Sequence, residues 1–175
     1  RGAVDMAVAQ VAAGWRALVA SAGGGMVREL IRAGAEHITL PLDTKNPIAM
    51  RRNAGLLADV IRREGVNLVH ARSRAPAWSA HRAAQETGTP FMTTFHGVYS
   101  LGLFGLKKRY NSIMTRGTRV IAISEFIRDH LVTEYGMDAR DIRVIHRGVD
   151  TDIYDPNRIS PKRLIQVTSR WRLPD

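Results

Sequence analysis

Short apolar runs alternate along the chain with longer segments of helical periodicity, and this alternation constrains the fold more than any other feature. The runs lack a period of two, as expected of strands that are covered on both faces. They lie at residues 17–21, 37–40, 68–71, 91–94, 120–123 and 142–145. Because strand and helix alternate, the sequence predicts an α/β fold with a doubly wound, mostly parallel sheet and helices on both faces.

The segments between the runs carry apolar stripes and end signals typical of helices. In residues 48–64, Leu57 and Ile61 belong to an apolar stripe, whereas Arg62 lies off it. Ser124 is suited to cap a helix that starts at Glu125. We expect helices over residues 3–13, 26–33, 48–64, 76–86, 106–115 and 125–135.

Residues 1–150 are expected to form one domain, since a length of 175 residues suits a single hydrophobic core. Arg1 and Gly2 come directly before a helix, so we expect this domain to lack the strand that opens a doubly wound unit. Residues 151–175 are polar and rich in arginine, and they are expected to form a linker and tail.

The composition excludes several kinds of site. There is no cysteine, which rules out disulfides and thiolate chemistry. Metalloprotease and serine-hydrolase motifs are absent, and aromatic residues make up only 6%, too few for a single-stranded nucleic-acid platform. The formal net charge is +10, with no acidic residue between Glu86 and Glu125. This excess predicts either an anionic partner or simply solvated helix faces.

Parallel sheets bind ligands beyond the carboxyl ends of their strands, so the residues after each run are the candidates. Arg72 and Arg74 follow residues 68–71 and could grip a phosphate or carboxylate, or could be solvated surface residues. His96 follows residues 91–94 and offers an imidazole, while Gly97 lets a ligand approach the backbone. His70 lies inside a run and is interpreted as a packed core histidine.

Two further positions have open interpretations. Lys107, Lys108 and Arg109 follow an apolar, glycine-jointed loop at residues 100–105. Such a surface predicts contact with an anionic bilayer or lipid tail, a partner domain, or ordinary packing. Ser124 and Glu125 either cap a helix only or also face a binding cleft.

Several segments, taken in order, resemble glycosyltransferase family 4, and more narrowly the amino-terminal half of a bacterial GT-B enzyme of envelope or lipopolysaccharide sugar assembly. The resemblance covers about residues 1–156 and rests on residues 38–47, 67–73, 93–97, 120–125 and 145–150. It implies a Rossmann-like domain that is one half of a GT-B enzyme, on the acceptor side. The second, nucleotide-sugar domain is not in this sequence.

The resemblance implies transfer of a sugar, of the hexosyltransferase type, from a nucleotide-sugar to an envelope glycan or lipid-linked acceptor with retention of configuration. No cofactor and no metal are expected, and these 175 residues alone should be inactive. The implied location is the cytoplasm, with attachment to an anionic inner membrane face left open; nucleic acid is not an expected partner. The alternative is a non-enzymatic, Rossmann-like phosphosugar-binding module.

The resemblance also assigns site residues. Thr94 and His96 would line the cleft, with His96 hydrogen-bonding the transferred sugar as the catalytic candidate. Gly2 would end the glycine-rich first loop, and Gly2 and Gly97 are the candidates for contacting the nucleotide-sugar. The candidates for holding the acceptor are Arg72, Arg74, Thr94, Tyr99, Lys107, Lys108, Arg109, Ser124 and Glu125.

Overall fold

The structure is a computed structural model that describes residues 1–100, 105–149, 151 and 154–172. The chain divides into two compact units, residues 1–145 and residues 146–175. Residues 101–104, which belong to the apolar loop considered above, and Asp150 lie outside the described residues.

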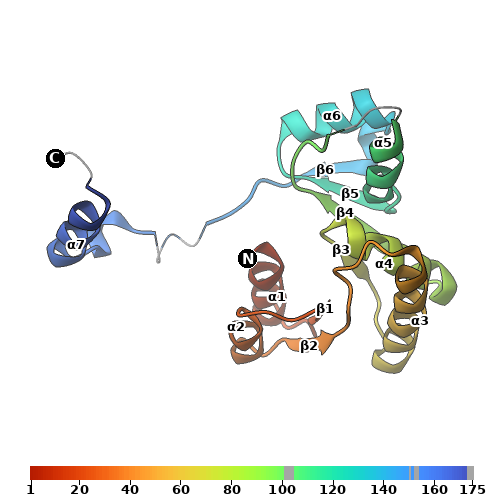
Figure 1. Ribbon diagram of the computed structural model, residues 1–175, viewed down its shortest axis with the longest axis horizontal. Helices are drawn as coiled ribbons and strands as arrows, with labels where there is room; N and C mark the ends of the chain where they lie inside the picture. The colour runs from red at the N-terminus through yellow and green to blue at the C-terminus, as the bar shows by residue number, and fades with distance from the viewer. Residues whose placement is uncertain (101–104, 150, 152–153, 173–175) are drawn as a thin grey trace. The chain divides into compact units, whose positions relative to one another are not determined.

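In the first unit, helices and strands alternate as the sequence predicts (Figure 1). Its elements are α1 (Gly2–Ala12), β1 (Leu18–Ser21), α2 (Val27–Arg32), β2 (Glu36–Thr39), α3 (Pro47–Glu64), β3 (Val69–Ala71), α4 (Arg74–Thr87), β4 (Phe91–Phe95), α5 (Leu106–Asn111), η2 (Ser112–Thr115), β5 (Arg119–Ala122), α6 (Glu125–Tyr135), η3 (Ala139–Asp141) and β6 (Ile142–Val144). The helix expected over residues 106–115 is therefore an α-helix that tightens into a 3₁₀ turn.

All the strand pairs are parallel, which confirms the predicted fold class. The strands form two sheets rather than one: β1 pairs with β2, and β3, β4, β5 and β6 follow one another in the second sheet. A doubly wound sheet usually has the order 3-2-1-4-5-6. In the described part of this chain, neighbouring strands within each sheet are consecutive in the sequence.

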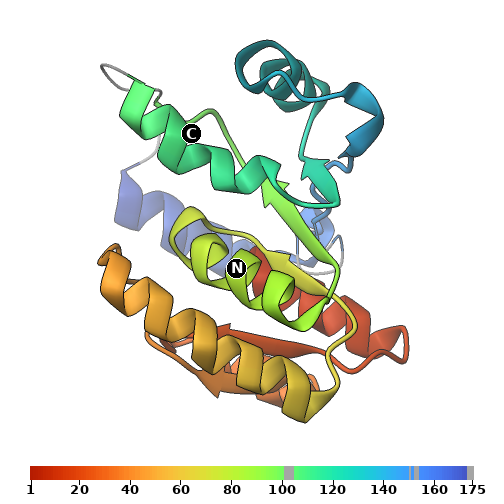
Figure 2. The same ribbon diagram turned by 90° about the vertical axis from the view of Figure 1, so that its right-hand side faces the viewer.

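Two hydrophobic clusters correspond to the two sheets. The larger cluster includes Phe95, Met114 and Leu131, each fully buried among residues of β3–β6, the helices α3, α4 and α6, and the turn η2. The smaller cluster joins α1 and α2 to β1 through residues such as Ala7 and Leu30. Figure 2 shows α3, α4 and α5 as neighbouring helices that cover one face of the strands.

Helix ends follow the local sequence. Asn46 caps α3, because its side-chain oxygen accepts hydrogen bonds from the backbone N–H groups of Ile48 (2.9 Å) and Ala49 (3.3 Å). Gly65 ends the same helix at φ +61°, in the left-handed region that glycine adopts without strain. The α3 helix is thus held at both ends, and its first turn lies next to α4 through the hydrogen bond from Ser79 Oγ to the Met50 carbonyl (2.9 Å).

The second unit contains a short turn, η4 (Pro156–Arg158), and a helix, α7 (Pro161–Trp171). Only a linker and tail were predicted for these residues, because the polar, arginine-rich composition of α7 masks an apolar stripe. Leu164, Ile165 and Trp171 are the exposed apolar side chains of α7. Across the described residues of both units, no helix combines the length and the apolar character needed to cross a bilayer.

Candidate functional site

The carboxyl ends of β3 and β4 bring several of the predicted residues together. These two strands pair in parallel, with Ala71 opposite Thr93, so the residues that follow them share one edge of the sheet. We call the group formed here by Gly2, His70, Arg72, Thr94 and His96 the strand-end site.

A short hydrogen bond joins the two strands in this site. Nε2 of His70 lies 2.7 Å from Oγ1 of Thr94, and Thr94 is almost fully buried. Burial, together with the nearby charges of Arg72 and His96, lowers the pKa of His70 from 6.5 to about 4. His70 is therefore neutral at pH 7 and orients the Thr94 hydroxyl, as a structural histidine rather than a charged ligand.

Arg72 lies beside the amino terminus of α1. A Cβ atom built on Gly2 would lie only 2.9 Å from Nη2 of Arg72, so the two residues are in close contact. The amino terminus of an 11-residue helix carries a partial positive charge, which adds to that of the guanidinium. This corner of the site is suited to an anionic group.

His96 and Gly97 follow β4 directly and are both half-buried, so His96 is not enclosed in the core. A Cβ on Gly97 would meet no atom within 4 Å, which leaves its backbone open to approach. Tyr99 packs on Phe95 with ring centroids 4.7 Å apart. Burial raises the pKa of the Tyr99 hydroxyl, while the charge of Arg74 opposes that shift.

Arg74 and Arg72 have different surroundings, although the sequence places them two residues apart. The Arg74 guanidinium lies 4.2 Å from the centre of the Tyr99 ring, and its Nη1 donates to Oδ1 of Asn111 at 2.8 Å. Asn111 is fully buried and donates in turn to the Ser100 carbonyl (3.1 Å). Arg74 thus fixes the segment after β4 to α5, a structural role that was not predicted from the sequence.

The other candidates lie on α5 and α6. Lys107 and Arg109 are exposed, whereas Lys108 is half-buried with its Nζ 5.9 Å from the centre of the Tyr135 ring. Ser124 caps α6, since its Oγ accepts a hydrogen bond from the Ile127 N–H (3.3 Å), and Glu125 forms an ion pair with Arg128. The hydrogen bond and the ion pair agree with the interpretation of Ser124 and Glu125 as helix-capping residues. That Ser124 and Glu125 also contact a ligand stays a prediction.

The strand-end site therefore combines a guanidinium, a helix amino terminus, an oriented hydroxyl and a half-buried imidazole. Such a set can bind a phosphate, a carboxylate or the hydroxyl groups of a sugar. Within the described part of the chain, no group of three or more His, Asp or Glu side chains is arranged to hold a metal ion. The ligand-binding roles of the individual residues stay predictions.

A comparison with protein families finds that the model of Glycosyltransferase Family 4 matches residues 1–153. That range contains the whole strand-end site. The same range includes every strand of the two sheets. A comparison with curated proteins finds no match.

Solved structures resemble the whole chain or most of it. A glycosyltransferase from Rickettsia africae is 39% identical over 100% of this chain and 46% of its own, with a TM-score of 0.82. HepE of Anabaena in complex with UDP and glucose is 18% identical over 96% of this chain and 46% of its own (TM-score 0.70). The lipopolysaccharide outer core galactosyltransferase WaaB is 16% identical over 74% of this chain and 35% of its own (TM-score 0.55).

The chain therefore spans less than half the length of each of these solved structures. The likeness to HepE and WaaB supports the half-GT-B, Rossmann-like fold with helices on both faces of parallel strands. The family match over most of the chain, together with the Rickettsia relative, shows that this chain belongs to glycosyltransferase family 4.

Proposed function

We propose that this chain is the acceptor-binding half of a retaining glycosyltransferase, which moves a sugar from a nucleotide-sugar to an envelope glycan or lipid-linked acceptor. The observation that carries the proposal is the family match, which includes the strand-end site within residues 1–153. Two solved structures of the same fold add support, since one is a complex with UDP and glucose and the other is a lipopolysaccharide galactosyltransferase.

The proposed mechanism is electrostatic positioning. Arg72 and the amino terminus of α1 would hold an anionic group at one corner of the strand-end site, because both present positive charge there. Thr94, oriented by neutral His70, would present its hydroxyl beside them. His96 would hydrogen-bond the transferred sugar and so hold it in a reactive orientation, rather than attack it.

The location of the protein forms part of the proposal. The exposed cations Lys107 and Arg109 on α5 would lie against the anionic inner face of the membrane, where a lipid-linked acceptor is found. The enzyme would then act in the cytoplasm as a peripheral protein. The resemblance to the family also predicts that EDTA leaves the transfer rate unchanged.

The test is a His96→Ala variant of the full-length protein, assayed with a panel of nucleotide-sugars by release of the nucleoside diphosphate. We expect the transfer rate to fall about tenfold or more, since one well-placed hydrogen bond in the transition state is worth at least about 1.4 kcal/mol. The control is His81→Ala, because His81 is also partly buried but packs on Phe91, at the opposite end of β4 (ring centroids 5.2 Å apart).

An unchanged rate in His96→Ala would remove this residue from the site. Equal losses in His96→Ala and His81→Ala would point to a general effect on folding instead. The anomeric configuration of the product, read by NMR, tests retention: an inverted product would contradict that part of the proposal.

A further inference from the structure

A cavity of about 330 Å³ lies between α3, α4 and α5, on the helical face of the first unit. None of its lining residues belongs to the strand-end site. We call it the helix-face cavity. Its charged lining residues are Lys45, just before α3, Arg51 in the first turns of α3, and Arg82 on α4.

Among the described residues, these three cations share the cavity lining with no acidic side chain. The lining contains no Asp or Glu, and neither α3 nor α4 has an acidic residue in its first turn. Other arginines of α3 are paired: Arg62 with Glu86 (2.9 Å) and Arg63 with Glu64 (2.8 Å). Over the residues that the structure describes, the side chains of Lys45, Arg51 and Arg82 form neither ion pairs nor hydrogen bonds. Their positive charge is available to a ligand.

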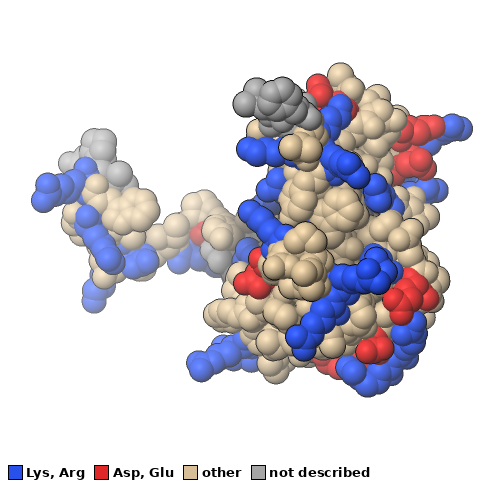
Figure 3. Space-filling model, turned by 45° about the vertical axis from the view of Figure 1, so that its right-hand side comes forward, with Lys and Arg blue, Asp and Glu red and all other residues tan. Residues whose placement is uncertain are grey.

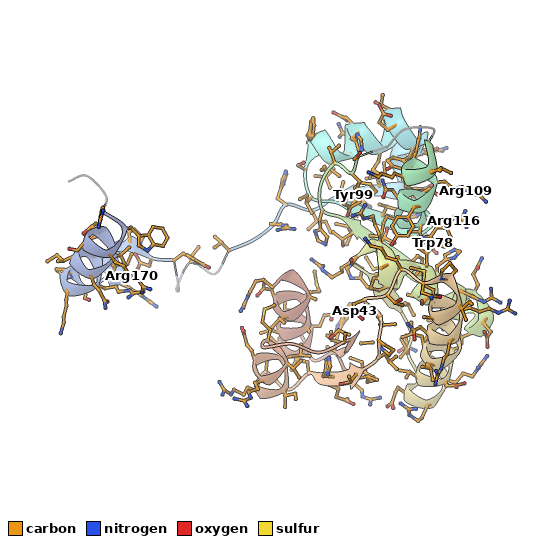
Figure 4. All side chains as sticks on the ribbon, in the orientation of Figure 1. Asp43, Trp78, Tyr99, Arg109, Arg116 and Arg170 are labelled. Carbon is orange, nitrogen blue, oxygen red and sulfur yellow. The ribbon has the colours of Figure 1, made fainter. Side chains whose placement is uncertain are left out.

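The rest of the lining is uncharged and held in place by contacts of its own. The indole Nε1 of Trp78 donates to the Tyr110 carbonyl at 3.2 Å, and the two rings stack with centroids 6.3 Å apart. Arg116 covers Trp78 from outside the cavity, with its Cζ 5.6 Å from the ring (Figure 4). Met50 and Pro47 complete the apolar part of the lining. These contacts hold the uncharged lining side chains against one another.

Figure 3 turns forward the side of the molecule that carries these helices, and Lys and Arg side chains border an uncharged central area there. Cations around an apolar floor are complementary to a ligand with a charged head and an uncharged body. A phosphate can accept two parallel hydrogen bonds from one guanidinium, and its multiple negative charges match the three cations of the lining better than a singly charged carboxylate does. A helix amino terminus at α3 adds further positive potential.

We propose that the helix-face cavity binds a phosphate or diphosphate group attached to an uncharged body. Lys45, Arg51 and Arg82 hold the phosphate oxygens, and Trp78 and Tyr110 contact the uncharged part. The same chemistry is found in a soluble phosphate ester and in a phospholipid headgroup. The proposal does not depend on glycosyl transfer, since it concerns binding at a place outside the strand-end site.

The first experiment measures binding of pyrophosphate to the full-length protein by calorimetry. The test variant is the double substitution Arg51→Gln and Arg82→Gln, and the control is Arg28→Gln and Arg52→Gln. The control removes the same charge from α2 and α3 at exposed arginines that do not line the cavity. We expect the test variant, which removes two guanidinium contacts, to bind at least about tenfold more weakly, a loss of at least about 1.4 kcal/mol, and the control to stay within about twofold.

The second experiment uses sedimentation with vesicles of phosphatidylglycerol and phosphatidylcholine, compared with vesicles of phosphatidylcholine alone. A loss of binding in the test variant only, and only on the anionic vesicles, identifies a lipid headgroup as the source of the phosphate. Loss of pyrophosphate binding without an effect on vesicles identifies a soluble phosphate ester.

Two results would overturn the proposal. One is that the unaltered protein binds neither pyrophosphate nor anionic vesicles. The other is that the test and control variants lose affinity equally, which would mean that total charge rather than the cavity attracts the anion. Circular dichroism of both variants, compared with that of the unaltered protein, shows whether either loss reflects misfolding. If the test variant misfolds, Lys45→Gln, which alters a residue outside the helices, replaces it, and Arg52→Gln is then the control that removes one charge outside the cavity. Lys45→Gln should bind pyrophosphate more weakly than Arg52→Gln, and equal binding by the two would overturn the proposal.

Discussion

The strand-end site and the helix-face cavity are both basic, but they differ in whether their polar side chains contact other residues of the protein. In the strand-end site, His70 and Thr94 bond to each other, and Arg72 lies against the amino terminus of α1. In the helix-face cavity, Arg51 and Arg82 are exposed and, over the described residues, bond to no other side chain. One region therefore depends on the folded core for its geometry, whereas the other presents charge on a helical surface.

Because of this difference, we expect substitutions in the two regions to change different properties, namely the stability of the fold in one region and ligand binding in the other. A change in the strand-end site should disturb the core below it, because buried polar and aromatic groups cannot be removed without cost. A change of a cation at the helix-face cavity should affect a ligand but hardly affect folding.

The largest effect is expected beneath the strand-end site. Phe95 is fully buried and supports Tyr99, so Phe95→Ala should lower the free energy of unfolding by about 3 to 5 kcal/mol. Trp78→Ala at the helix-face cavity should cost less than half of that, because Trp78 is only half-buried. Urea unfolding measures both values. Similar losses would remove the contrast between the two regions.

Acid should weaken the protein through the strand-end site. The unfolded His70 takes up a proton below pH 6.5, whereas the folded side chain stays neutral down to about pH 4. The unfolded state thus binds more protons in this window, and stability should fall by about 2 kcal/mol from pH 7 to pH 5. His70→Gln should reduce this dependence, and His146→Gln, at an exposed position, should preserve it. Urea unfolding at both pH values checks the prediction, and an equal dependence in both variants would contradict it.

A smaller loss is expected when the hydrogen bond between the strands is removed. Thr94→Val keeps the size of the side chain but leaves Nε2 of His70 without its partner, which should cost about 1 kcal/mol or more. Thr118→Val is the control at an exposed position and should change stability by less than about 0.5 kcal/mol. If the two variants unfold at the same urea concentration, the bond has no net effect on stability.

The smallest effect on folding is expected at the helix-face cavity. Arg51→Gln and Arg82→Gln should each change the free energy of unfolding by less than about 0.5 kcal/mol, because these exposed side chains have no partner to lose within the described structure. Thermal or urea unfolding of each variant gives the value. A loss above 1 kcal/mol would reveal a structural role that the contacts do not show.

Much of the fold could be predicted because its signals are local. Periodicity indicates which segments become strands and helices, and α6 begins and ends at the predicted residues, Glu125 and Tyr135. Parallel strand order then places Arg72, Thr94 and His96 at one edge of a sheet. The separation of β1–β2 from β3–β6 was not predicted, since it does not follow from the period of apolar residues. The helix α7 was not predicted either, because its polar, arginine-rich composition masks its apolar stripe.

The helix-face cavity could not be predicted for a different reason. Trp78 and Arg82 are four residues apart and so share a face of α4, a pattern visible in the sequence. Their proximity to Arg51 depends on how α3 packs against α4, and no local pattern specifies that packing. Similarly, only the packed structure shows that Arg74 lies against Tyr99 and Asn111.

By itself, the amino-acid sequence determined the alternation of strands and helices and the placement of polar residues after β3 and β4, because side-chain periodicity and strand order act locally. Only the tertiary structure decided which basic side chains bond to other residues and which remain exposed to solvent. That choice depends on contacts between residues distant in the chain, such as Arg74 with Asn111, and those contacts form only when the helices pack.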